Sequence, residues 1–175
     1  MSIKNETKKN ILPTENMDYE FIITRLAPCG LHCGKCFAFS EGKICQLSKD
    51  LQNNLGNFDA YAERFVDLLN EPLFLKYPEF RGILNYFSFG KCKGCRKEKC
   101  VLFKKCLVRE CSENKRVDFC FQCSAFPCDK TGFDENLQKR WKLANEEMKE
   151  CGVEAYYNKV KDIPRYWIIT KYDFG

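Results

Sequence analysis

The spacing of apolar residues predicts helices in the middle of the chain. Between Asp50 and Asn70 they recur at steps of three and four, the period of an amphipathic helix. A shorter segment at 78–88 repeats this period and is followed by Gly90. We expect the Phe-rich stretch at 73–89 to lie in the core. This helical spacer contains no cysteine.

The helical period returns toward the end of the chain. One face of a helix beginning at 134 is formed by Leu137, Trp141, Ala144 and Met148. Thr131 or Asp134 is expected to cap its start, and Gly152 its end. A further helix is expected over 153–162, because Pro164 cannot continue it.

Two segments rich in aromatic and β-branched residues predict short strands, at 19–27 (YEFIITRLA) and at Tyr166–Thr170 (YWIIT). The expected fold class is therefore α+β, a mainly helical small domain with few short strands and Cys-rich, metal-tied loops. Residues 1–18 are polar and are expected to form a mobile N-terminal lead. Residues 19–175 are expected to form a single Cys-rich metal-binding domain.

No apolar run approaches the roughly 18–20 residues that a transmembrane helix requires. Residues 1–20 lack the apolar segment of a secretory signal. We therefore expect no membrane association and a cytoplasmic location, where disulfides do not persist. The 13 cysteines, an odd number, also argue against a complete set of disulfides.

The cysteines are clustered along the chain, with four in 29–45, eight in 92–128 and one at 151. Pairs at C-x2-C spacing in loops rich in Gly and Lys are typical of metal ligands. Because such pairs fit a tetrahedral site of four sulfurs, Zn²⁺ is the expected metal, with an iron–sulfur cluster as the alternative.

The second group of cysteines can be divided between two ions. The first predicted set is Cys92, Cys95, Cys106 and Cys111. The second contains Cys120, Cys123 and Cys128, and its fourth ligand is unassigned. Cys100 is the expected spare, although it could replace Cys106.

The first group has the spacing Cys29-x3-Cys33-x2-Cys36. This spacing matches the loop with which radical S-adenosylmethionine enzymes hold a [4Fe–4S] cluster, leaving one iron open for chemistry. Two features oppose that reading: Lys35 occupies a position that is usually aromatic, and the following sequence lacks alternating strands and helices. The other hypothesis is that these cysteines bind zinc and complete the site of Cys120, Cys123 and Cys128.

Few other residues suggest catalysis. His32 is the only histidine, nothing around it supports a catalytic triad, and we expect it to face solvent. Cys45 and Cys151 are not expected to bind metal, and Cys151 is expected to pack at a helix end. No Walker or G-x-G-x-x-G loop is present. Whether the chain is an enzyme remains open at this stage.

The positive charge is concentrated in residues 91–130, which hold 11 Lys and Arg against 5 Asp and Glu. A basic Cys-rich segment can indicate a zinc module that binds nucleic acid. However, each zinc ion bound by four thiolates carries a net charge of about −2, which nearby cations can balance. We therefore rank nucleic-acid binding below a metal-stabilised fold.

Four segments together, APCGLHCGKC at 27–36, KCKGC at 91–95, LVREC at 107–111 and CFQCSAFPC at 120–128, resemble one microbial Cys-rich family. That family is known as a domain of unknown function and is described as zinc-binding. The resemblance extends over about 27–162 and supplies no reaction. It implies that the metal ligands are Cys29, Cys33, Cys36, Cys92, Cys95, Cys106, Cys111, Cys120, Cys123 and Cys128.

The expected function is that of a zinc-binding protein of unknown biochemical activity, resembling a zinc finger in that Cys-bound metal stabilises the fold. It would act as an interaction module for an unidentified protein partner, through the loop at 91–116 or the flanking helices. The first alternative is an iron–sulfur or thiol redox enzyme that uses Cys29, Cys33 and Cys36. The second alternative is a zinc module that binds nucleic acid.

Overall fold

The computed structural model describes residues 18–166, and this part of the chain is all-α. Seven α-helices and three short 3₁₀ helices follow one another in it. Its β pairing consists of two isolated bridges, Leu26 with His32 and Phe39 with Cys92. The expected α+β class is therefore wrong, because the described residues form helices and loops without a sheet.

The segment expected to be a strand at 19–27 instead forms helix α1 (Tyr19–Arg25). Asp18 caps it, because its side chain accepts a hydrogen bond from the backbone N–H of Glu20 at 3.1 Å. Ile22 and Leu26, four residues apart, are both buried. Helical spacing thus buries both residues without a partner strand. The other expected strand, beyond Tyr166, lies outside the described residues.

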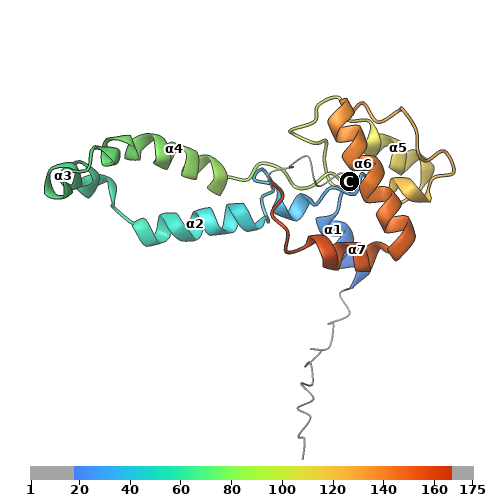
Figure 1. Cartoon of the computed structure of the whole chain (residues 1–175), viewed down its shortest axis with the longest axis horizontal. Helices are drawn as coiled ribbons and strands as arrows, with labels where there is room; N and C mark the ends of the chain where they lie inside the picture. Colours follow the sequence, from blue (N-terminus) through green and yellow to red (C-terminus); the bar gives the residue numbers. More distant parts are fainter. Residues whose placement is uncertain (1–17, 167–175) are drawn as a thin grey trace, which may run out of the picture.

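The spacer between the cysteine groups forms an arm, defined here as residues 43–89, that projects away from the rest of the molecule (Figure 1). It contains α2 (Lys43–Leu55), α3 (Asp59–Leu69), the 3₁₀ helix η2 (Pro72–Lys76) and α4 (Tyr77–Ser88). The single helix expected at 50–70 is two helices, because α2 ends at Gly56 with φ +53°. The helix expected at 78–88 is confirmed as α4.

The arm is narrow and holds few buried side chains. Helices α2 and α4 pack together, and the thiol of buried Cys45 donates a hydrogen bond to the carbonyl of Ser88 at 3.1 Å. At the tip, Phe58 lies among the rings of Phe65, Phe74 and Tyr77. The Phe-rich stretch was expected to be core, but Phe80 and Phe89 are exposed (45% and 72%), because two paired helices leave their outer faces uncovered.

The remaining elements form the body, defined here as residues 18–42 and 90–166. Its helices after α1 are α5 (Val108–Lys115), α6 (Glu135–Cys151) and α7 (Val153–Val160). The expected helices at the C-terminal end are confirmed. Asp134 caps α6 by accepting from the backbone N–H of Leu137 at 2.9 Å, and Gly152 ends it with φ +87°. Helix α5 was not predicted.

The core of the body lies along α6. One cluster of buried residues joins α1, α6 and α7 through Ile22, Leu26, Phe119, Ala144, Met148, Tyr156 and Tyr157. A second cluster places Ala27, Val108 and Trp141 against several cysteines. The thiols are therefore packed into the core. No helix within 18–166 has the length and apolar character needed to cross a membrane.

Candidate metal centre

Two of the C-x2-C loops have the same backbone. Cys33–Lys35 forms η1 and Cys120–Gln122 forms η3, each a single 3₁₀ turn between extended residues. The backbone N–H of Cys36 donates to the carbonyl of Cys33 at 2.8 Å. In the same way, the backbone N–H of Cys123 donates to the carbonyl of Cys120 at 3.0 Å. A single turn of this kind lets two thiols reach one ion.

The third C-x2-C loop, at 92–95, lies beside the chain that follows Cys36. The backbone N–H of Cys92 donates to the carbonyl of Ala38 at 2.8 Å, and the backbone N–H of Ser40 donates to the carbonyl of Cys92 at 2.9 Å. Gly94 adopts φ +96°, which favours glycine, and its N–H points to the sulfur of Cys92 at 3.4 Å. Two cysteine segments distant in sequence are thus held together by backbone bonds.

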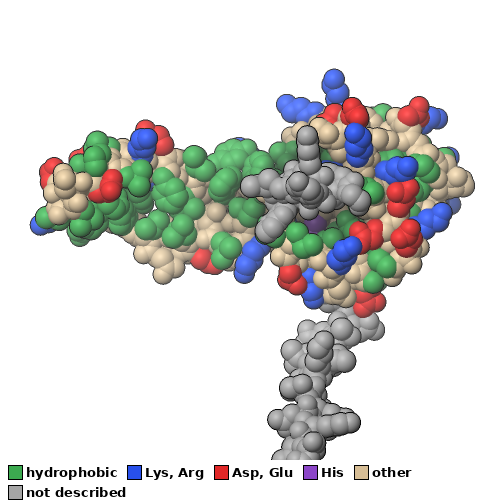
Figure 2. Space-filling model, in the orientation of Figure 1, with side chains coloured by type: hydrophobic (Ala, Val, Ile, Leu, Met, Phe, Trp, Pro, Cys, Tyr) green, Lys and Arg blue, Asp and Glu red, His purple; other side chains and the backbone are tan. Residues whose placement is uncertain are grey.

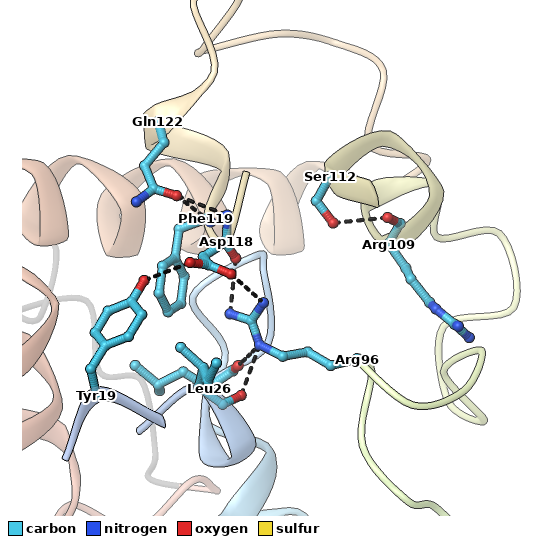
Figure 3. A network of polar contacts seen from close by, with 9 residues as sticks. Tyr19, Leu26, Arg96, Arg109, Ser112, Asp118, Phe119 and Gln122 are labelled. Atoms are coloured by element: carbon cyan, nitrogen blue, oxygen red, sulfur yellow. Dashed lines mark hydrogen bonds and ion pairs between the residues drawn. The ribbon is translucent and has the colours of Figure 1, made fainter. Parts of the chain in front are cut away.

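The guanidinium of Arg96 connects this loop to α1 and to the segment before η3 (Figure 3). Its Nε donates to the carbonyls of Ile23 and Leu26, at 2.7 and 3.2 Å, and its Nη2 donates to the carbonyl of Asp118 at 2.9 Å. It also stacks over the ring of Phe119 at 4.9 Å. These contacts fix the separation of three segments that carry or precede cysteines.

Asn145 of α6, which is fully buried, joins two further cysteine loops. Its side-chain oxygen accepts from the backbone N–H of Phe121 at 3.0 Å, and its amide nitrogen donates to the carbonyl of Cys29 at 3.1 Å. The backbone N–H of Cys120 also donates to the carbonyl of Pro28 at 3.0 Å. The first and last cysteine segments are therefore in direct contact on α6.

Four thiols from three segments line one small cavity of about 30 Å³. We call this set the Cys120 cluster: Cys111, Cys120, Cys123 and Cys128. Cys111 comes from α5, the next two from the η3 loop, and Cys128 from the chain that leads to α6. Lys115 and Lys130 also line the cavity. Four sulfur donors and two nearby cations suit a metal centre of negative net charge.

Trp141 of α6 forms part of the same cavity wall. Its ring is 1% exposed and meets Phe126 edge to face, with centroids 5.0 Å apart. Burial raises the pKa of the Cys120 thiol to about 11, and the indole N–H of Trp141 acts against that rise. The nitrogen of this indole is buried and has no hydrogen-bond partner in the described chain.

A second group of thiols, the Cys33 cluster, contains Cys33, Cys92, Cys95 and Cys100. Hydrogen bonding with Cys95 lowers the pKa of Cys33 to about 7 and that of Cys100 to about 6. The pKa of Cys95 is raised in return, through its contacts with Cys100 and Cys33. Burial raises the pKa of Cys92, and the charges of Cys33 and Cys100 add to this.

Three further predicted ligands lie around these clusters. Burial strongly raises the pKa of Cys29, and Cys33, Cys106 and Cys120 add to this rise, so its thiol lies near members of both clusters. Cys106 lies near Cys100 and lines an open pocket with it. Cys36 packs in one buried cluster with Cys92, and its sulfur accepts from the hydroxyl of Tyr166 at 3.8 Å.

The thiols are grouped differently from the expected pairing. Cys111 lies with Cys120, Cys123 and Cys128, and so takes the fourth position, which the first group of cysteines had been hypothesised to fill. Cys92 and Cys95 lie with Cys33 and Cys100, and Cys106 does not complete a set of four. Within residues 18–166, no group of three or more His, Cys, Asp or Glu side chains is arranged so that it could hold a metal ion.

The other singled-out residues also differ from expectation in part. His32 was expected to face solvent, but both its ring nitrogens are buried and the ring stacks on Tyr157 with centroids 5.3 Å apart. Burial and the neighbouring Lys35 and Arg165 lower the pKa of His32 to about 4. Cys151 was expected to pack but is exposed at the last residue of α6.

Comparison with known proteins gives one match. The model of a family described as "Protein of unknown function (DUF3795)" matches residues 25–133. This range contains the arm and twelve of the 13 cysteines, all except Cys151. No curated protein and no solved structure matches the chain. The resemblance to a Cys-rich family of unknown function is thereby confirmed.

Proposed function

We propose that this chain, which belongs to the DUF3795 family of proteins of unknown function, is a metal-stabilised interaction module. Cysteine thiolates of the body hold zinc, and the arm presents the surface that binds a partner. The observation that carries the proposal is the convergence of four thiols, from three separate segments, on the cavity of the Cys120 cluster.

The donor set of this cavity supports zinc or an iron–sulfur site over magnesium and calcium. All four candidate ligands are thiols, and no His or carboxylate side chain lines the cavity. Four thiolates favour zinc or iron–sulfur sites, whereas magnesium and calcium require oxygen ligands. When bound, zinc would cross-link α5, the η3 loop and the chain before α6. Lys115 and Lys130 would offset the net negative charge of that centre.

A second zinc ion is proposed for the other group of thiols. Its ligands would be Cys33, Cys92 and Cys95, with a fourth thiol from Cys100 or Cys36. The mutual effects on pKa of Cys33, Cys95 and Cys100 support their proximity, and the backbone bonds between residues 38–40 and Cys92 support the pairing of the two loops.

The fold favours a structural role over radical chemistry at Cys29, Cys33 and Cys36. Radical S-adenosylmethionine enzymes require a barrel of strands and helices, and residues 18–166 contain only isolated β-bridges. These three cysteines are also divided between two buried clusters, since Cys29 packs with Cys33, whereas Cys36 packs with Cys92.

The arm supports the interaction part of the proposal. Figure 2 shows hydrophobic side chains gathered over it, and eleven large apolar residues there are exposed: Leu47, Leu51, Tyr61, Leu68, Leu69, Leu73, Leu75, Phe80, Ile83, Tyr86 and Phe89. Extended apolar surface of this kind marks protein interaction sites. The arm holds five Lys and Arg and six Asp and Glu, so its partner needs an apolar face of little net charge.

The test of the metal centre is elemental analysis of the anaerobically purified chain with thermal melts. We expect zinc and no visible colour, and chelation should greatly lower the melting temperature. The reason is that a structural zinc site contributes on the order of 10 kcal/mol before ordering costs. Cys123→Ser should lose one equivalent of zinc.

The matched control is Cys151→Ser, which changes an exposed thiol at the far end of α6 and should keep both the zinc and the melting temperature. A metal-free chain with an unchanged melt under strong chelation would contradict the proposal. A brown protein containing iron would support the iron–sulfur alternative instead.

A further inference from the structure

The indole nitrogen of Trp141 is a buried donor that has no hydrogen-bond partner within the described chain. Leaving such a group unsatisfied destabilises a protein, and native proteins seldom do so without a reason. The ring is held firmly, since Trp141 is 1% exposed and Phe126 packs against it edge to face. The unpaired N–H therefore has a fixed direction.

Trp141 lines the cavity of the Cys120 cluster together with all four of its cysteines. Of the four thiols, Cys120 is the one that the indole N–H approaches. A neutral thiol is a weak acceptor, whereas a metal-bound thiolate carries negative charge and accepts N–H bonds well. The partner that the N–H lacks would thus be created when the sulfur binds a metal.

We propose that the indole N–H of Trp141 donates a hydrogen bond to the metal-bound thiolate of Cys120. Trp141 is then a positioning residue that orients this ligand and strengthens metal binding without touching the ion. This inference rests on the proposed function, because it requires a metal in the Cys120 cluster. Removing a partner of this kind from a metal site costs about 10–100-fold in affinity.

The α6 scaffold explains why the donor is in place before metal arrives. One turn further along α6, Asn145 is bonded to the carbonyl of Trp141 and to the backbone of both cysteine loops. The helix is therefore fixed relative to the η3 loop that carries Cys120. A donor on such a rigid support loses little entropy when the bond forms.

The direct test is NMR of the full chain loaded with ¹¹³Cd in place of zinc. We expect the indole proton of Trp141 to move downfield on loading and to show scalar coupling to the cadmium that sits in the four-thiolate site. The chain has one other tryptophan, Trp167, and a Trp167→Phe variant assigns the signal.

The outcomes separate the two proposals. If no cadmium signal typical of four thiolates appears, the metal centre itself is refuted. If that signal appears but the indole proton neither shifts nor couples, the centre stands and the role of Trp141 is refuted.

A second measurement compares affinities by competition with a chelator. Trp141→Phe, which keeps an aromatic ring and removes the donor, should bind zinc about tenfold or more weakly at unchanged stoichiometry. Phe126→Leu, which disturbs the same ring pair but keeps the donor, is the matched control and should change affinity much less. Equal losses in both variants would indicate that Trp141 acts by packing alone.

Discussion

Arg96 is the residue whose individual contacts do most to hold the cysteine segments together. Its planar guanidinium reaches carbonyls of α1 and of Asp118 at once, and its face covers the ring of Phe119 (Figure 3). A lysine carries the same charge, but its single ammonium group cannot span these acceptors or stack in the same way.

We therefore predict that Arg96→Lys lowers the free energy of unfolding by about 2 kcal/mol or more, because buried carbonyls lose their donors. Denaturant titration followed by circular dichroism measures this. Arg109→Lys is the matched control: Arg109 pairs with partly exposed Glu113 within one helix, and such pairs contribute only about 0.3–0.5 kcal/mol. Equal effects of the two variants would refute the role assigned to Arg96.

Two glycines of the chain, Gly82 and Gly90, differ in whether the structure has room for a larger side chain. Gly82 lies inside α4, and a Cβ added there would meet nothing within 4 Å. Gly90 follows α4 where the arm rejoins the body, and a Cβ there would lie 2.6 Å from the Cα of Ser40. The same substitution should therefore have opposite effects at the two positions.

Gly82→Ala should stabilise the chain by about 0.5–1 kcal/mol, because alanine has the higher helix propensity. Gly90→Ala should destabilise it, because the backbones of residue 90 and Ser40 must move apart. Paired thermal melts of the two variants measure both effects. A stabilising Gly90→Ala would show that the arm and the body are less closely joined than the structure indicates.

The two parts of the molecule, the body and the arm, differ in how far their apolar residues are buried. The body buries its side chains along α6, whereas the arm leaves eleven large apolar residues exposed. A second copy of the arm is an apolar surface with nearly balanced charge, and so meets the requirement stated above for a partner.

We predict that the purified chain self-associates as its concentration rises, because burying apolar surface stabilises the complex. Leu68→Glu combined with Leu73→Glu should abolish association without changing the zinc content, since both side chains are more than 60% exposed. Sedimentation velocity over a range of concentrations measures it. Leu143→Glu, an exposed site on α6 of the body, is the control; a wild type that stays monomeric would contradict the prediction.

Elements that depend on local chemistry could be predicted from the residues alone. The period of Leu137, Trp141, Ala144 and Met148, with Asp134 and Gly152 at the ends, was enough to predict α6. The C-x2-C spacing likewise identified candidate ligands, because the bite of one turn is a local property. The family resemblance depended on the same ordered motifs.

Contacts between residues far apart in the chain depend on how the helices pack, and they could not be predicted from spacing. Cys111 joins Cys120 because α5 and the η3 loop both pack on α6, and spacing along the chain carries no information about that contact. Segment 19–27 became a helix because packing of Ile22 and Leu26 on α6 and α7 outweighs β propensity. The exposure of apolar residues on the arm could not be predicted from the sequence either. An amphipathic period shows that one face of a helix is apolar, but not whether another element covers that face.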